Sequence, residues 1–286
     1  MNSVYISFPN FNPVAISIFN ISIRWYGVMY LLGFFFVLYQ GKICIRKIGL
    51  KKREIEDILY FSFLGLFIGG RIGYILFYNP VFFFNNFLNI FKVWEGGMSF
   101  HGGLLGVIIV IFYFSKKFNK KFFLISDLIA PLVPFGLGIG RIGNFINGEL
   151  WGRVAPDFPF SVLFPNSRFL DLEVSKHDLR LQELINKFGV LPRHPSQIYE
   201  FFLEGIILFI ILYYLSKVIK TIGVVSSAFL IFYGIFRIIV EYFREPDYQI
   251  GLLKHTLTMG QILSIPMIIY GFMVIIIIYN PIKKLK

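Results

Sequence analysis

The chain has 286 residues, of which 56% are hydrophobic and 15% are charged, and its mean hydropathy is +0.70. Soluble domains average about 45–50% apolar and about 25% charged residues, so this composition excludes an ordinary soluble protein and indicates an integral membrane protein. A net charge of +12 would suggest nucleic-acid binding in a soluble chain, but most lysines here lie in short patches between apolar runs. Such patches are typical of topology signals and of contacts with anionic lipid, and we expect no nucleic-acid partner.

Apolar runs that could cross about 30 Å of hydrocarbon as helices recur along the whole chain. They predict seven membrane spans, near residues 18–40, 57–79, 98–115, 122–142, 199–216, 223–243 and 261–280. We therefore expect an all-α polytopic membrane protein with a single integral domain, residues 1–286. The one long connection, residues 143–198, is polar and contains several prolines, which predicts a small extracytoplasmic cap between spans four and five. Within it, residues 171–188 have the pattern of an amphipathic helix.

The direction of the spans follows from the lysines and arginines of the short loops, which collect on the cytoplasmic side of a membrane. The loops after spans one, three and five and the C-terminus carry most of them, namely Lys42, Arg46, Lys47, Lys51, Lys52, Arg53, Lys116, Lys117, Lys120, Lys121, Lys217, Lys220, Lys283, Lys284 and Lys286. In the short segments on the opposite side there are only Lys92, Arg244 and Lys254. We expect the N-terminus outside and the C-terminus in the cytoplasm.

Polar residues within the spans fall at one level of the predicted bundle, toward the outer leaflet. A charge near the bilayer centre costs about 2.5–3.5 kcal/mol even on the lenient insertion scale, so such residues usually have a function. Six spans contribute Arg24, Tyr26, Arg71, His101, Arg141, Asn144, Glu200, Glu204, Tyr233, Arg237 and Glu241. The spacing i, i+4, i+8 puts Tyr233, Arg237 and Glu241 on one face of span six. Glu200 and Glu204 share a face of span five in the same way, and we expect both faces to point into the bundle.

Arginines in an outer-leaflet cavity suit a phosphoanion, because the planar guanidinium binds phosphate with two donors and keeps its charge when desolvated. The natural anion at that depth is a phospholipid headgroup. A structural interpretation stays open, since an Arg–Glu pair can simply hold helices together. It is favoured for Arg71 in the segment GGRIGY, whose small residues indicate close helix packing, and we interpret Glu200 and Glu204 as counter-ions.

The densest motif is GRIGNFINGELWGR, residues 140–153, in which glycines alternate with arginine, asparagine and glutamate. Glycines at this frequency cannot sustain a stable helix to the end of the segment, so the backbone can approach a ligand closely at the outer interface. The motif gains specificity beside HGGLLG at 101–106, RHPSQIYE at 193–200, and the run from Arg237 through EYFREPD to MGQILSIPM. The combination closely resembles the bacterial phosphatidylglycerol:prolipoprotein diacylglyceryl transferase family, in the same order over nearly the whole chain.

The resemblance implies transfer of a diacylglyceryl group from phosphatidylglycerol to the lipobox cysteine thiol of a preprolipoprotein. A thioether forms and glycerol 1-phosphate leaves, as the first step of bacterial lipoprotein maturation. It also implies a multi-pass protein of the bacterial cytoplasmic (inner) membrane, with seven spans and a site that opens to the outer face. The residues that match the family's important positions are Tyr26, His101, Arg141, Asn144, Glu149, Gly152, Tyr233, Arg237 and Glu241.

The chemistry of such a transfer suggests a role for each residue type. A free thiol has a pKa near 8.5 and is only slightly ionised at neutral pH, so a base is useful, and His101 is the histidine at the level of the cluster. It could instead be a hydrogen-bonding residue that ends a helix. Arg141 and Arg237 are expected to bind the phosphate and to neutralise charge as the C–O bond breaks.

The other matched residues are expected to support these groups. Glu241 would position Arg237, and Glu149 would orient Arg153 or Arg141. Asn144 and Tyr26 could donate hydrogen bonds to the headgroup, Tyr233 belongs to the same substrate-binding set, and Gly152 is interpreted as a requirement of the backbone. We expect no cofactor, because the single cysteine excludes a cysteine-based metal site and neither HExxH nor a Walker loop is present.

Two other functions remain open on the residues alone. A transporter or scramblase of anionic lipid would also need an arginine-lined cavity, but it predicts polar groups at the midplane or through the full depth of the membrane. A structural scaffold would use the Arg–Glu pairs only to hold the bundle, and would need neither His101 nor the glycine-rich motif.

Overall fold

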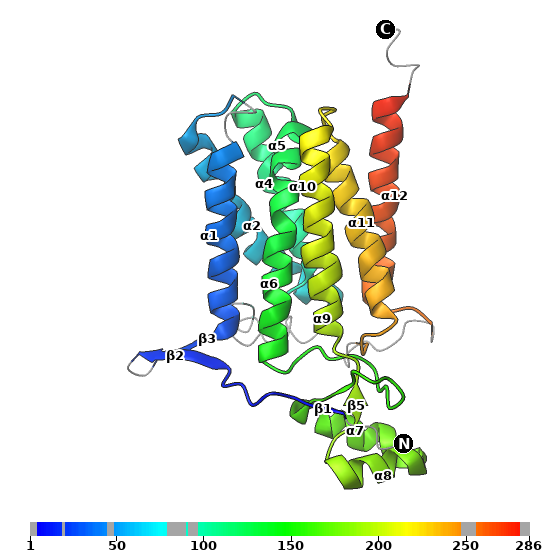
Figure 1. The fold of residues 1–286 in the computed structure, drawn as a ribbon. Helices are drawn as coiled ribbons and strands as arrows, with labels where there is room; N and C mark the ends of the chain where they lie inside the picture. Colours follow the sequence, from blue (N-terminus) through cyan, green and yellow to red (C-terminus); the bar gives the residue numbers. More distant parts are fainter. Residues whose placement is uncertain are drawn as a thin grey trace.

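The computed structural model describes residues 5–18, 21–44, 49–78, 90, 97–246 and 256–280. Within these residues the chain is a bundle of long helices with a small α/β segment, formed mainly by residues 147–195, at one end (Figure 1). The helices of the bundle are α1 (Trp25–Cys44), α2 (Lys52–Tyr78), α4 (Phe100–Lys117), α5 (Phe122–Ile129), α6 (Val133–Ile146), α9 (Ser196–Glu200), α10 (Leu208–Val218), α11 (Val224–Glu241) and α12 (Met259–Tyr279). The 3₁₀ turn η4 (Ala130–Leu132) joins α5 to α6, and the π-helical turn η7 (Phe201–Ile207) joins α9 to α10, so each pair forms one continuous rod.

The expectation of a helical, polytopic membrane protein is confirmed. Six of the described helical rods are long and apolar enough to cross a membrane, and they correspond to spans two to seven of the prediction: Lys52–Phe77, Phe100–Lys117, Phe122–Ile146, Ser196–Val218, Val224–Glu241 and Met259–Tyr279. The 20-residue helix α1 stands in the same bundle at the place of the expected first span, but it is not among these six. The count of seven is therefore not established. Arg46, Lys47, Lys92, Lys254, Lys283, Lys284 and Lys286, which contribute to the charge asymmetry, lie outside the described residues.

The first span was predicted to begin near residue 18, but residues 14–18 and 21–24 form the two strands of a β-hairpin. Its strands β2 (Val14–Ile18) and β3 (Ile21–Arg24) pair in antiparallel fashion, with Val14 opposite Arg24. The alternation of isoleucine and valine with smaller residues explains the difference, because β-branched side chains favour strands over helices. Arg24 is consequently an exposed residue of the hairpin and not part of the buried polar level that the sequence predicted.

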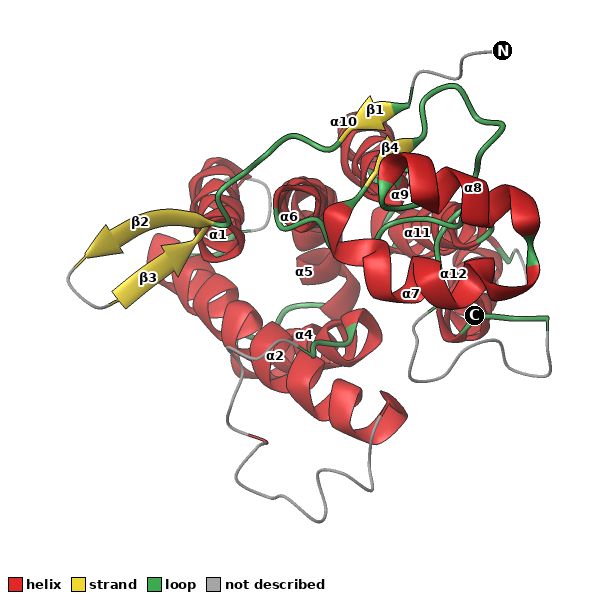
Figure 2. Ribbon diagram, turned by 90° about the horizontal axis from the view of Figure 1, so that it is seen from below, coloured by secondary structure: helices red, strands yellow, loops and turns green. Residues whose placement is uncertain are grey.

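The segment between α6 and α9 contains the α/β part. Strand β4 (Val162–Leu163) pairs in parallel with β1 (Ile6–Ser7) and in antiparallel with β5 (Pro192–Arg193). The amphipathic helix expected over 171–188 is instead two helices, α7 (Arg168–Val174) and α8 (Leu179–Phe188), which follow the 3₁₀ turns η5 (Pro165–Ser167) and η6 (Ser175–His177) respectively. Asp178 divides them, because its side chain accepts hydrogen bonds from the backbone N–H groups of Arg180 and Leu181 and so caps a new helix. Figures 1 and 2 place this segment across the ends of α9, α11 and α12.

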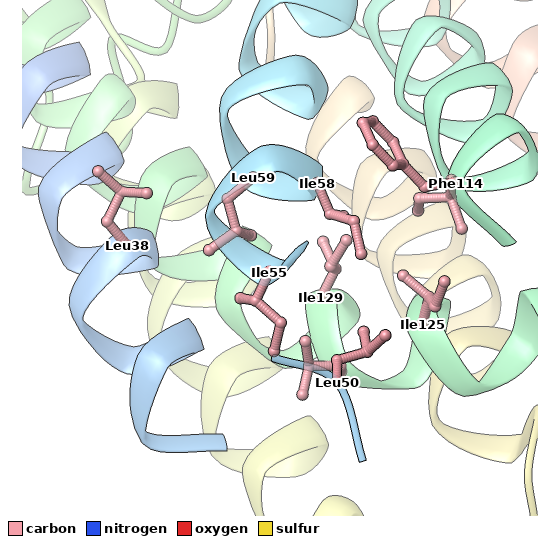
Figure 3. Close-up of a cluster of buried hydrophobic side chains, with 10 residues drawn as sticks. Leu38, Leu50, Ile55, Ile58, Leu59, Phe114, Ile125 and Ile129 are labelled. Atoms are coloured by element: carbon pink, nitrogen blue, oxygen red, sulfur yellow. The ribbon is translucent and has the colours of Figure 1, made fainter. Parts of the chain in front are cut away.

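Apolar and polar interiors are separated along the bundle. At the end away from the α/β segment, the last part of α1 and the beginnings of α2 and α5 bury a purely apolar cluster that includes Leu38, Ile55 and Ile125 (Figure 3). The buried charges lie toward the other end, where α6 and α11 finish and α9 begins. This separation leaves one end of the bundle available for a site.

Glycines bring α2 and α4 into close contact. A methyl group on Gly106 would lie 1.9 Å from the carbonyl oxygen of Gly65, and one on Gly102 would lie 2.3 Å from that of Gly69. Small residues let helix backbones approach in this way within a membrane. Arg71 on α2 is buried and donates to the carbonyl oxygens of Ile90 (2.9 Å) and Gly97 (3.1 Å), which supports its structural interpretation.

Candidate active site

Glu200 is the centre of a buried cluster of charged side chains. Its Oε1 accepts hydrogen bonds from Arg237 and, at 3.1 Å, from Arg244, while its Oε2 lies 3.3 Å from Nε of Arg141. The carboxylate is completely buried. Three arginines therefore meet at the first turn of the α9–α10 rod. Arg141 comes from α6, Arg237 from α11, and Arg244 from the chain just after α11.

Two more carboxylates complete the cluster. Glu204 accepts from Nη2 of Arg141 at 3.1 Å, and its other oxygen lies 3.7 Å from Nη1 of Arg237. Glu241, one turn beyond Arg237 on α11, forms an ion pair with Nη2 of that arginine. The expectations that Glu241 pairs with Arg237 and that Glu200 and Glu204 are counter-ions are confirmed. Both faces that the i, i+4 spacing predicted also point into the bundle.

The cluster is balanced in charge, with three arginines facing three glutamates. Isolated charges could not be buried at this depth, but paired ones can be. Of the three guanidinium-bearing side chains Arg141 is the most exposed, at 15%, against 11% for Arg237 and 8% for Arg244. An incoming anion would therefore reach Arg141 most easily.

His101 lies beside this cluster in the first turn of α4. Ser99 caps the helix by accepting a hydrogen bond from the backbone N–H of Gly102, so the position of His101 follows from where α4 begins. The imidazole is close enough to Arg237 and Glu241 to interact electrostatically with both. Its buried Nε2 has no hydrogen-bond partner among the described residues. Such an atom calls for an explanation, as do the other buried side-chain atoms of the described residues that lack a hydrogen bond, Oε1 of Glu204 among them.

Tyr233 closes the cluster on the side of the apolar interior. Its ring stacks between Phe100, at 4.2 Å between centroids, and Phe229, at 5.7 Å, and only 1% of the residue is exposed. Its hydroxyl is near enough to Arg141 and Glu204 for electrostatic interaction. The stacking fixes this polar group at the boundary between the charged and apolar parts of the interior.

Asn144 and Glu149 form a second polar group at the end of α6. Nδ2 of Asn144 donates to Oε1 of Glu149 at 2.8 Å, and Nδ2 of Asn147 reaches the same oxygen at 3.4 Å. The expectation that Glu149 orients Arg153 or Arg141 is wrong for the described residues, where its carboxylate makes no ion pair with an arginine. The helix ends after Ile146 and leaves Gly148 and Leu150 with positive φ, so Glu149 turns back toward Asn144.

Tyr26 lies on α1 against this part of α6. Its hydroxyl is 3.0 Å from that of Tyr30, and a methyl group on Gly143 would lie 3.3 Å from its ring. It is close enough to Arg141 and Glu149 to interact electrostatically with both. The glycines of α6 thus allow α1 to bring Tyr26 to the edge of the charged cluster.

Gly152 lies in a backbone ladder that joins three segments. Its N–H donates to the carbonyl oxygen of His194 at 2.8 Å, and the N–H of Arg153 donates to that of Phe243 at the same distance. A methyl group on Gly152 would lie 2.5 Å from the Phe243 oxygen and 2.6 Å from the Cβ of His194. The interpretation of Gly152 as a backbone requirement therefore has a steric basis. Arg153 itself donates through Nε to the carbonyl oxygen of Arg244 at 3.1 Å.

A second histidine near the ladder has a different environment. His194 packs between Phe158 and Phe243, and its Nδ1 lies 3.1 Å from the hydroxyl of Tyr199. Burial lowers the pKa of His194 below the ordinary value, so its imidazole is neutral at pH 7. Of the two, His101 has a buried ring nitrogen without a hydrogen-bond partner among the described residues.

Sequence reasoning missed the role of two arginines. Arg244 was interpreted as a loop charge, yet it is buried and bonds Glu200. Its position seven residues after Arg237 is a helical repeat that could have revealed it. Arg193 begins the motif RHPSQIYE but received no role, although it is the largest fully buried side chain of the described residues.

The fold and this site define a class: a polytopic membrane protein with a charge-balanced arginine–glutamate cluster buried at one end of its bundle. The family model for prolipoprotein diacylglyceryl transferase matches residues 13–277. The chain belongs to that family, and thus to a family of membrane transferases.

Curated relatives agree with the family model. Three of them are named phosphatidylglycerol–prolipoprotein diacylglyceryl transferase and come from Buchnera aphidicola subsp. Baizongia pistaciae (strain Bp), Wigglesworthia glossinidia brevipalpis and Serratia proteamaculans (strain 568). They are 64%, 56% and 53% identical to this chain. The matches cover 96%, 96% and 98% of this chain and 99%, 99% and 97% of the relatives. The similarity therefore extends over the bundle and the α/β segment alike.

Because three arginines share Glu200, its removal should destabilise the fold strongly. We expect Glu200→Ala to lower the free energy of unfolding by about 3–5 kcal/mol, as for other buried ion pairs from which one partner is removed. Glu56→Gln is the control, since Glu56 pairs with Lys42 on a partly exposed surface of α2. Thermal unfolding in detergent would measure both variants. Equal midpoints for Glu200→Ala and wild type would show that the arginines do not depend on this carboxylate.

Proposed function

We propose that this chain transfers the diacylglyceryl group of phosphatidylglycerol to the lipobox cysteine of preprolipoproteins, as the names of its relatives indicate. The sulfur of the cysteine attacks the terminal glyceryl carbon of the lipid, and the bond from that carbon to the phosphate oxygen breaks. The oxygen keeps the electron pair and leaves with glycerol 1-phosphate. The products are a thioether and one phosphate monoester, and the proton of the thiol balances the charge.

One observation carries the proposal, namely the buried arginine–glutamate cluster with the free Nε2 of His101 beside it. A scaffold needs the ion pairs but not an imidazole nitrogen that is buried without a hydrogen bond. A transporter needs polar groups along a path, whereas the buried cluster around Leu38, Ile55 and Ile125 at the other end of the described bundle is apolar. The arrangement supports a reaction at one level of the membrane.

Arg141 and Arg237 bind the phosphate in this proposal. Each guanidinium has five N–H donors, and the carboxylates of the cluster do not use all of those on Arg141. The phosphodiester would add one negative charge to a neutral cluster, which makes Arg141, the most exposed of its arginines, the first contact. As the C–O bond breaks, charge grows on the leaving oxygen and the same donors stabilise it.

The remaining residues hold the substrate and these donors in place. Glu241 holds Arg237, and Gly152 lets the backbone ladder close. Tyr26, Asn144 and Tyr233 supply hydroxyl and amide groups around the headgroup, with Glu149 orienting Asn144. Such positioning can contribute as much to the rate as the chemical groups themselves.

His101 is the base that takes the proton of the thiol. Transfer of that proton to Nε2 forms the thiolate, and the imidazolium can return it to the leaving phosphate. Every proton is then accounted for without a cofactor.

The protein lies in the bacterial cytoplasmic membrane with its site toward the outer leaflet and the α/β segment outside. The support comes from the short loops, where lysines and arginines collect on the side opposite the α/β segment. In that orientation the site meets preprolipoproteins as they are exported.

Purified protein incubated with phosphatidylglycerol and a lipobox peptide should increase the mass of the peptide by one diacylglyceryl group. We expect His101→Gln to slow this transfer about 10²- to 10⁴-fold, the usual contribution of a positioned base. Raising the pH toward 8.5 should partly rescue the variant, because the thiol then ionises without help. The matched control is His177→Gln, on the exposed surface of η6. Lack of transfer by the wild type would refute the function, and parallel pH profiles would refute the role of His101.

The orientation can be tested with topology reporters. A reporter fused after residue 120 or at the C-terminus should report the cytoplasm, and one near residue 175 the exterior. An exterior signal at the C-terminus would refute the proposed direction of the bundle.

A further inference from the structure

A buried chain of charges connects the α/β segment to the backbone ladder. Asp171 of α7 and Arg193 of β5 are both completely buried. Oδ1 of Asp171 accepts from Nε of Arg193 at 2.7 Å, and its Oδ2 accepts from Ser167 and from the backbone N–H of Leu191. These contacts of Asp171 hold the guanidinium of Arg193 in one orientation.

The other side of that guanidinium holds two segments of the ladder at once. Nη1 of Arg193 donates to the carbonyl oxygen of Gly152 at 3.0 Å and to Oε2 of Glu245 at 2.7 Å. The backbone beside these groups is also bonded, since the N–H of Glu245 donates to the carbonyl oxygen of Trp151. Arg193 therefore fixes the chain that follows α11 against the chain that follows α6.

Arg244 lies between these contacts and the cluster. It directly precedes Glu245, and its Nη1 donates to Oε1 of Glu200, the oxygen that Arg237 also uses. A shift of Glu245 would move Arg244 and disturb the oxygen around which the arginines are arranged. Neither Asp171 nor Arg193 forms a hydrogen bond or ion pair with the glutamates of the cluster among the described residues.

We propose that Arg193, oriented by Asp171, is a positioning residue that sets the place of Arg244 and through it the geometry of the arginine cluster. The inference rests on the proposed function, because the cluster's geometry matters only if the cluster acts on a substrate. Lysine cannot replace arginine here, since it keeps the charge but not the planar fork that reaches Asp171, Gly152 and Glu245 together.

The test is a double-mutant cycle with Arg193→Lys and Arg244→Lys in the full-length protein, using phosphatidylglycerol and a lipobox peptide. We expect Arg193→Lys to lower kcat about 10- to 100-fold, since a misplacement of reacting groups by about 1 Å can cost up to about 100-fold. In the Arg244→Lys background the same change should lower kcat less than about twofold, because the effects of residues that act through one another are not additive. Arg180→Lys is the control, since Arg180 forms an exposed pair with Asp157 in the same segment and should leave kcat unchanged.

The outcomes separate this inference from the function on which it rests. An inactive wild type would overturn the proposed function and the inference with it. With an active wild type, a normal kcat for Arg193→Lys, or losses that multiply in the double variant, would overturn the inference alone. If Arg193→Lys does not fold, Glu245→Gln serves in the same cycle, because it weakens the contact with Arg193 at a partly exposed side chain. Additive losses with that variant would overturn the inference equally.

Discussion

The structure depends on the way in which Glu200 shares its carboxylate among three arginines. In an interior of low dielectric a charge persists only when an opposite charge and hydrogen bonds compensate it. Glu200, Glu204 and Glu241 provide this compensation for Arg141, Arg237 and Arg244. A phosphate headgroup would then meet guanidinium groups that are already oriented, so little reorganisation is needed when it binds.

The surrounding fold serves to bring these side chains together. Arg141 reaches the cluster from the second half of α6, Glu200 from the last residue of α9, and Arg237 from the last turns of α11. Asp127 fixes the other end of α11 by accepting from the backbone N–H groups of Gly223 and Ser226. Gly260 at the start of α12 leaves room for Glu241, since a methyl group there would lie 2.6 Å from its carboxylate oxygen. Small residues of the bundle therefore influence the site indirectly, because they let the helices that carry its side chains pack closely.

Local periodicity was sufficient to predict the helices and the face on which Tyr233, Arg237 and Glu241 lie, because these depend on neighbours within one helix. The predicted start of the first helix, near residue 18, was wrong, since alternating β-branched residues before Trp25 form a hairpin instead. The burial of Arg193 and Arg244 depends on contacts between segments more than 40 residues apart, which only the folded chain joins. Asn144 and Asn147, the partners of the Glu149 carboxylate, are near it in the sequence, and these contacts depend on where α6 ends. The spacing of Arg244 from Arg237 is a helical repeat, but no periodic signal reports the contacts of Arg193, and the motif RHPSQIYE could be recognised without revealing that its first residue is completely buried.

The central claim is that the arginine cluster binds the phosphate of a lipid headgroup. Native mass spectrometry of the protein released from nanodiscs can compare retention of phosphatidylglycerol with that of diacylglycerol, which has the same chains but no phosphate. We expect the wild type to prefer phosphatidylglycerol and Arg141→Lys largely to lose this preference, because lysine cannot bind phosphate with a planar fork. An unchanged preference in Arg141→Lys would contradict the central claim.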